Sequence, residues 1–152
     1  MTGSRRFVVL RAHDRWCALP LPVVAETMRP LPIDPVPAQP PFVLGVAVIR
    51  GGPVPVVDLR RLMGVSPASP PARFVTLCVE GRLCAVAADE VAGIHELREE
   101  ALGSLPPLLR DAGEALIDAL AVLDRKLLLV LQAGRIIPQE VVGPAGPAGG
   151  ET

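Results

Sequence analysis

GVAVIRGGPVPVVDLR, the stretch at residues 45–60, carries the clearest signal of the fold in this chain. Two short apolar runs flank the dipeptide Gly51-Gly52, which accepts a positive φ at both positions and suits a two-residue hairpin turn. We therefore predict a strand at 45–50, a turn at 51–52 and a second strand at 53–58. The rest of the chain is organised around this hairpin.

One charged residue stands out in the hairpin. With the turn at 51–52, Arg50 pairs with Pro53 and shares one face with Val46 and Val48. Both faces are otherwise apolar, which predicts that other parts of the protein cover both of them. The ordinary interpretation of Arg50 is a side chain that extends to solvent from the end of a strand.

The composition indicates a globular protein with an aliphatic core. Of the 152 residues, 50% are hydrophobic and only 3% are aromatic, and the net charge is -1. This composition excludes a disordered chain, and the lack of a basic block argues against binding to nucleic-acid phosphates. No apolar run reaches the roughly 18 residues of a membrane span, and no signal-peptide core follows the N-terminus. We expect a cytoplasmic protein that does not insert into the membrane.

The remaining sequence shows many short strands, separated by turn residues at close intervals, and little helix. Strands are predicted at 7–11, 16–19, 73–79, 83–88, 91–97, 116–123 and 127–131. Short helical turns are predicted at 23–26, between an Asp58 cap and Gly64, within 98–109 and at 132–137. This pattern favours an all-β protein of small barrels, in two lobes that share an interface.

The domain boundaries follow from composition. We expect residues 7–141 to form a single domain whose two lobes join near 65–72, where Ser and Pro cluster. Residues 1–6 are expected to form a flexible N-terminus, and 142–152 a disordered tail rich in Gly, Pro and Ala. The prolines between residues 30 and 41 predict an extended surface connector that leads to the central hairpin.

The sequence shows no phosphate loop, no serine-hydrolase elbow and no zinc-protease motif. Cys17 lies near His13, which leaves a small Cys-dependent hydrolase as a hypothesis, but no third group is placed to orient such a pair. Cys78 and Cys84 flank a predicted turn and could face each other as a redox pair, although two small buried thiols are the ordinary interpretation. We expect no catalytic residue, no metal site and no cofactor.

Three further motifs accompany the central hairpin. Val24-Ala25-Glu26 precedes it, Val86-Ala87-Ala88-Asp89-Glu90-Val91 follows it, and Leu123-Asp124 with residues 127–131 ends the series. In this order and spacing the motifs resemble those of the CheW-type chemotaxis coupling proteins of bacteria, from about residue 7 to about residue 138. The resemblance implies two five-stranded SH3-like β-barrel subdomains packed around a shared apolar interface, with a few short helices.

The resemblance also implies a non-enzymatic adaptor. Such proteins link the cytoplasmic tips of methyl-accepting chemoreceptors to the regulatory domain of the histidine kinase CheA, in arrays associated with the membrane. Other CheW-like domains are a further kind of partner. Carried over position by position, the resemblance assigns partner contacts to Arg50, Gly51, Gly45, Val24, Glu26, Val48 and Val91.

Three positions depart from the family pattern. Val48 stands where the family usually has Asn, Ala119 where Gly is common, and Gln132 where Asp often follows the last strand. The departure at Val48 lies nearest the implied contact surface. It leaves open, as the alternative, a divergent CheW-like scaffold in another chemosensory or surface-motility pathway.

Overall fold

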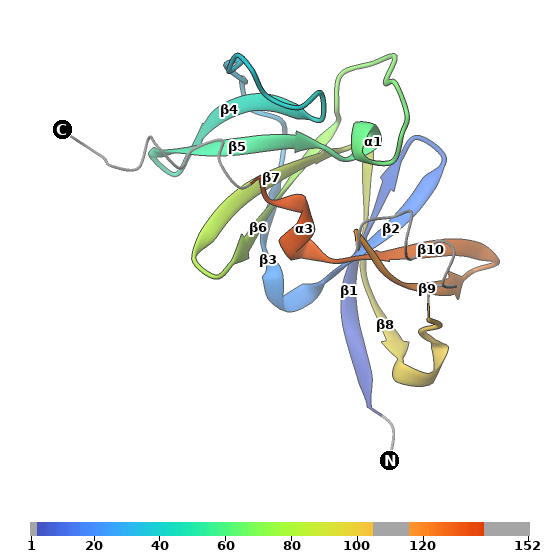
Figure 1. Ribbon diagram of the computed structural model, residues 1–152. Helices are drawn as coiled ribbons and strands as arrows, with labels where there is room; N and C mark the ends of the chain where they lie inside the picture. Colours follow the sequence, from blue (N-terminus) through green and yellow to red (C-terminus); the bar gives the residue numbers. More distant parts are fainter. Residues whose placement is uncertain (1–2, 105–115, 139–152) are drawn as a thin grey trace.

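The computed structural model of the protein describes residues 3–104 and 116–138, in which ten strands form two five-stranded sheets (Figure 1). Sheet A has the order β8-β1-β2-β10-β9 and comprises β1 (Ser4–Ala12), β2 (Arg15–Pro20), β8 (Glu90–Arg98), β9 (Ile117–Leu123) and β10 (Lys126–Leu131). Sheet B has the order β3-β6-β7-β5-β4 and comprises β3 (Val24–Met28), β4 (Val43–Ile49), β5 (Gly52–Asp58), β6 (Arg73–Val79) and β7 (Arg82–Ala88). The predicted all-β architecture of two five-stranded units is confirmed.

Helical structure is confined to single turns in the described residues. These are η1 (Leu21–Val23), α1 (Leu59–Leu62), η2 (Glu99–Ala101) and α3 (Ala133–Ile136). The Asp58 carboxylate caps α1 by accepting a hydrogen bond from the backbone N–H of Arg60 at 2.9 Å, as predicted. No helix in the described ranges is long and apolar enough to cross a membrane.

The predicted helix at 23–26 is wrong. The 3-10 turn η1 ends at Val23, and residues from Val24 onward form β3, which pairs antiparallel with β6. Pro22 does mark the start of a helical turn, because it lies in the first positions of η1, but that turn does not continue past Val23. Tertiary pairing with β6 then determines the conformation of the residues that follow.

The division of the chain between the two sheets differs from the predicted join near 65–72. Strands β5 and β6, on either side of that segment, both belong to sheet B. Sheet B is built from one continuous stretch, 24–88, and sheet A from the segments before and after it. Long-range parallel pairing explains the difference, since β10 pairs with β2 and β7 pairs with β5. Composition carries no signal of such pairing.

The central hairpin turns one residue earlier than predicted. Arg50 and Gly51 occupy the turn with φ of 54° and 81°, and the strand residues pair as Ile49 with Gly52 and Val48 with Pro53. Two successive positive φ values are the requirement of a type I′ turn, so Arg50 adopts a conformation that non-glycine residues rarely take. The outer face of the hairpin is not covered as predicted, because Val48 is 66% exposed.

The N-terminal prediction also needs correction. Strand β1 begins at Ser4, which pairs with Arg98 of β8, so residues 4–6 are ordered in sheet A rather than frayed. The predicted tail at 142–152 lies outside the described residues. The connector at 30–41 contains no helix or strand, has turns at 37–38 and 41, and forms an isolated bridge from Asp34 to Val46 of β4.

The largest apolar cluster lies between the two sheets. Helix α3 sits between them in Figure 1, and its buried residue Ile136 packs into this cluster. A second cluster surrounds Phe7 within sheet A, and a third surrounds Phe74 within sheet B. The fully buried members of the inter-sheet cluster include Leu10, Cys17, Leu19, Val57, Leu59, Val75, Leu77, Cys84 and Val86.

Candidate partner-binding site

The turn between β4 and β5 places Arg50 against Glu26 of β3. The Arg50 guanidinium donates from Nη2 to Glu26 Oε1 at 2.5 Å and from Nε to Oε2 at 3.1 Å, which makes a bidentate ion pair. Strands β3 and β4 are the two edges of sheet B, so the sheet curves enough for its opposite edges to be joined at this point. The side chain of Arg50 remains 77% exposed and that of Glu26 only 29%.

Thr76 holds Glu26 in place from the neighbouring strand. Its hydroxyl accepts a hydrogen bond from the backbone N–H of Glu26 at 3.1 Å and donates to the Glu26 carbonyl at 3.3 Å. The register of β3 against β6 shifts between Val24 and Glu26, and Thr76 satisfies the backbone groups that this irregularity frees. The buried Thr76 therefore positions the acidic partner of Arg50.

The ion pair changes the titration of both groups. Hydrogen bonds from Arg50, and then its positive charge, lower the pKa of Glu26 below its ordinary value of 4.5. The same contacts raise the pKa of Arg50 above its ordinary value. Both side chains are therefore charged at neutral pH, and the exposed guanidinium is held in one orientation rather than left to rotate in solvent.

A shallow apolar surface adjoins this pair. A hollow of about 240 Å³ is lined by Glu26 and Arg50 together with Ile49, Val54, Thr76, Ala25 and Leu83. Leu83 of β7 is 44% exposed, and Val48 is exposed on the outer face of β4. Exposed aliphatic groups beside a fixed cation are typical of a surface that binds another protein.

Gly45 has a structural reason to be glycine. Its φ is +146°, and a Cβ placed there would lie 2.2 Å from the carbonyl oxygen of Asp34. The connector lies against β4 at this point, with Asp34 N donating to Val46 O at 2.8 Å and Val46 N to Asp34 O at 2.9 Å. Gly45 thus permits the close approach of two backbone segments, and no contact surface is needed to explain it.

The other predicted contact residues lie elsewhere. Val24 and Val91 are partly buried and pack against the inter-sheet cluster, one from sheet B and the other from sheet A. The structure therefore brings Arg50, Gly51 and Glu26 together and does not place Val24 and Val91 in their contact network. Sequence reasoning missed Thr76 and Leu83. A lone threonine within the apolar run 73–79 was the available signal for the first.

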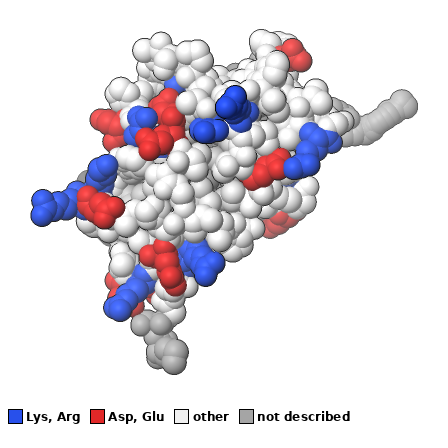
Figure 2. Space-filling view, turned by 180° about the vertical axis from the view of Figure 1, so that it is seen from behind, with Lys and Arg blue, Asp and Glu red and all other residues white. Residues whose placement is uncertain are grey.

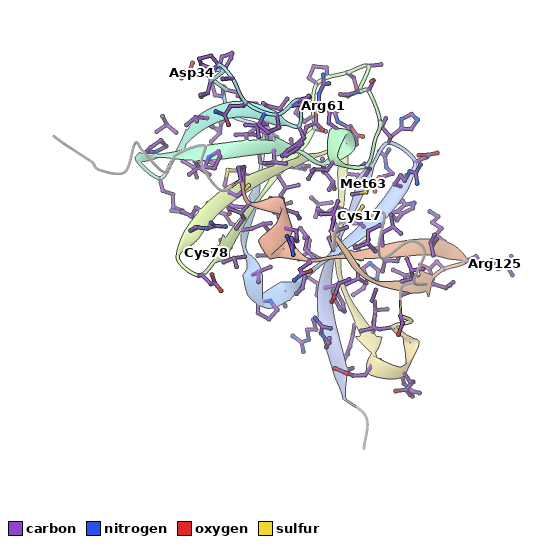
Figure 3. All side chains as sticks on the ribbon, viewed as in Figure 1. Cys17, Asp34, Arg61, Met63, Cys78 and Arg125 are labelled. Atoms are coloured by element: carbon purple, nitrogen blue, oxygen red, sulfur yellow. The ribbon has the colours of Figure 1, made fainter. Side chains whose placement is uncertain are left out.

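Two of the three thiols are buried, and Cys17 is separated in burial from the exposed turn that holds His13. Burial raises the pKa of Cys17 and of Cys84 to about 12, so neither is a thiolate at neutral pH. His13 lies in the exposed turn after β1, whereas Cys17 is fully buried. Figure 3 shows Cys17 where the two sheets meet and Cys78 far from it, toward the end of sheet B.

Cys78 and Cys84 do not face each other, which rules out the redox pair that the sequence left open. Cys84 lies opposite Leu77 on β6, whereas Cys78 lies opposite Leu83 on β7. Successive residues of a strand point to opposite faces, so the two sulfurs lie on different sides of the sheet. Cys84 is buried and Cys78 is exposed, which also corrects the expectation that both are buried.

Charges are mixed on the rear face of the molecule. Figure 2 shows Lys and Arg side chains interspersed with Asp and Glu, between wide areas that carry neither. A mixed face gives little long-range attraction for a strongly charged partner.

Comparisons with known proteins agree with this picture. The family model described as the CheW-like domain matches residues 6–141. The chain is 24% identical to the chemotaxis protein CheW of Rhizobium meliloti over 140 residues, which are 91% of this chain and 90% of that protein. It is 30% identical to protein FrzA of Myxococcus xanthus over 96 residues, which are 62% of this chain and 60% of that protein.

A solved structure shows the same fold. The scaffolding protein TtCheW from Thermoanaerobacter tengcongensis matches with a TM-score of 0.77 at 22% sequence identity. The match covers 86% of this chain and 90% of that one. The likeness therefore extends over both sheets rather than one of them.

Proposed function

The chain belongs to the CheW-like family, and from this premise we propose that it is a non-enzymatic adaptor of bacterial chemotaxis, which couples the cytoplasmic tips of chemoreceptors to the regulatory domain of the histidine kinase CheA. The observation that carries the proposal is the family match over residues 6–141, which includes both sheets and the Arg50 turn. The adaptor acts in receptor arrays on the cytoplasmic side of the membrane, without entering the membrane.

The geometry of the Arg50 turn supports a role in recognition. Arg50 binds Glu26 through Nε and Nη2, and Nη1 makes no hydrogen bond within the described residues. That nitrogen can donate to a carboxylate of a partner while the ion pair keeps the guanidinium in place. Leu83 supplies aliphatic area in the adjoining hollow, and Val48 is exposed on the outer face of β4. A receptor helix with apolar side chains and a carboxylate at helical spacing fits this combination.

The proposal is tested by pairwise binding of the full chain to a receptor cytoplasmic fragment and to the CheA regulatory domain, measured by isothermal titration calorimetry. Arg50→Ala is compared with Arg125→Ala as a matched control. Both arginines are exposed, and both occupy positive-φ positions in hairpin turns, at 54° and 67°. The two substitutions therefore remove the same charge and strain the backbone alike.

We expect wild type and Arg125→Ala to bind both partners, and Arg50→Ala to bind at least one of them about tenfold more weakly, as for a moderate interface contact. Failure of folded wild-type protein to bind either partner at tens of micromolar contradicts the adaptor function. Equal losses in the two variants contradict the assignment of the contact to Arg50.

A second candidate function keeps the fold and changes the pathway. The 30% identity with FrzA and the valine at position 48 favour a divergent scaffold in another chemosensory or surface-motility system. Such a scaffold would enter receptor assemblies without changing phosphorylation by the usual kinase. Adding the chain to receptor and CheA, and measuring the rate of kinase autophosphorylation, distinguishes the two functions.

A further inference from the structure

A buried arginine lies where the two sheets meet. Arg60 is 3% exposed and Asp58 is 1% exposed. The guanidinium donates from Nε to Asp58 Oδ1 at 3.0 Å and from Nη2 to Asp58 Oδ2 at 3.2 Å. Asp58 ends β5 and caps α1, so this bidentate pair belongs to sheet B.

The third guanidinium nitrogen continues the contacts toward sheet A. Arg60 Nη1 donates to Asp89 Oδ1 at 3.0 Å and to the carbonyl of Ser69 at 2.8 Å. Asp89 stands between β7 of sheet B and β8 of sheet A. Its Oδ2 accepts the backbone N–H of His13 at 2.7 Å, and its own N–H donates to the Arg11 carbonyl at 2.9 Å.

These bonds form one continuous path between the sheets. It runs from Asp58 at the end of β5 through Arg60 and Asp89 to the β1–β2 hairpin of sheet A. We define these three side chains as the inter-sheet clamp. The apolar cluster between the sheets is non-directional, because burial of hydrocarbon does not specify an angle. Hydrogen bonds of a planar guanidinium do specify one.

A buried ion network adds little stability compared with an apolar core of the same shape. Its best-documented role is to favour one structural arrangement over the alternatives. We propose that Arg60 is a positioning residue, which fixes the orientation of sheet A on sheet B. The effect of Arg60 on partner binding rests on the proposed function, whereas its effect on sheet orientation does not. The family resemblance assigns partner contacts to residues of both sheets, Glu26 in sheet B and Val91 in sheet A, and the clamp sets the relative placement of these two sheets.

The chain offers a direct measurement of sheet orientation. Cys78 is exposed on sheet B, whereas Cys17 and Cys84 are buried, so a spin label attaches selectively to Cys78. V122C adds a second label on sheet A, at an exposed position of β9. Double electron–electron resonance then gives the distribution of distances between the two labels, one on each sheet, in the chain of 152 residues.

The distribution is measured with the clamp intact, with Arg60→Met and with Asp89→Ala. Arg60→Met removes every contact of the guanidinium. Asp89→Ala leaves the Asp58–Arg60 pair in place and removes the side-chain contacts of Asp89 with Arg60 and with the His13 backbone, so it carries the test if Arg60→Met does not fold. Val130→Ala is the control, because it lowers stability by opening a cavity in the sheet A cluster, away from the clamp.

We expect a single narrow distribution for the parent and for Val130→Ala, and a broadened or shifted one for the clamp variants. Affinity for the receptor fragment and the CheA domain is expected to fall about tenfold in the clamp variants, within the range seen for substitutions remote from a ligand. It is expected to stay within about twofold for Val130→Ala, whose cavity lies outside the clamp.

Unchanged distributions in the clamp variants, or equal broadening in Val130→Ala, overturn the role of Arg60. Changed distributions with undiminished affinity overturn its consequence for binding. If the parent protein binds neither partner, the proposed function fails, while the distance distributions still decide whether Arg60 orients the sheets.

Discussion

Replacing Gly45 with alanine should destabilise the protein far more than the same replacement at Gly51. Gly51 has φ +81°, and a Cβ added to it would meet no atom within 4 Å. Gly51→Ala should therefore lower the free energy of unfolding only by the strain of a left-handed alanine, about 1 kcal/mol. At Gly45 the φ of +146° is closed to alanine, and the added carbon would lie 2.2 Å from Asp34 O and 2.9 Å from Ile33 Cγ2. Strain of about 1–3 kcal/mol adds to the loss of two backbone hydrogen bonds with Val46, each about 1 kcal/mol.

The sum for Gly45→Ala is about 3–5 kcal/mol, which corresponds to a fall in Tm of roughly 10–15 °C for a chain of this size. Differential scanning calorimetry of wild type, Gly45→Ala and Gly51→Ala provides the comparison. Gly52→Ala serves as the unstrained control, because its φ is not positive and a Cβ there meets nothing within 4 Å. Equal shifts for Gly45→Ala and Gly51→Ala would show that the approach of the connector to β4 does not constrain residue 45.

Three other outcomes follow from the site. Arg50→Ala should bind partners more weakly, and its Tm should change by less than about 3 °C, because exposed ion pairs add little stability. Unfolding of this variant would instead show that Arg50 is a structural residue. The pKa of Glu26 is lower in the folded than in the unfolded chain, so the ion pair stabilises the fold at neutral pH. This contribution to stability is lost as the pH falls below 4.5 and passes through the lowered pKa. The Tm difference between wild type and Glu26→Gln should therefore shrink from about pH 7 to about pH 3, and a constant difference would contradict the shift. When native protein is treated with iodoacetamide, mass spectrometry should detect modification of Cys78 alone, and of Cys17 and Cys84 only after denaturation. Modification of Cys17 in the native protein would support the hydrolase hypothesis.

Local signals in the sequence are sufficient for most individual elements. The gaps between the predicted strands, at 80–82 and 124–126, contain the observed turns at Glu80-Gly81 and Asp124-Arg125, and Asp58 caps α1 as predicted. These features depend on residues within a few positions of one another. The sequence pattern is therefore enough to identify them.

Features that depend on distant residues cannot be predicted in this way. Turn chemistry favours the two glycines over Arg50, because arginine rarely adopts positive φ. The structure places Arg50 in the turn, where Glu26, 24 residues earlier, binds its guanidinium. Local propensity puts Glu26 on a helix, and only pairing with β6 and the hydroxyl of Thr76 make that segment a strand. Family resemblance indicates which residues to consider for the site, but not which of them touch.

The same limit applies to the inter-sheet clamp. The sequence predicts a helix cap at Asp58, which the structure confirms, but it connects neither Asp58 nor Asp89 with Arg60. Their common partner Arg60 is evident only once β5, β7 and the β1–β2 hairpin meet in space. A buried charge network of this kind leaves no periodic pattern in the sequence, because its members come from unrelated segments.

Assembly of three components tests the adaptor function most directly. A receptor cytoplasmic fragment on vesicles, the CheA regulatory domain and the full chain are mixed, and sedimentation measures the CheA domain that is carried down with the receptor. We predict that the CheA domain sediments when the wild-type chain is present, and that it stays in the supernatant when the chain is omitted or replaced by Arg50→Ala. Sedimentation of the CheA domain that is the same with and without the chain would contradict the account.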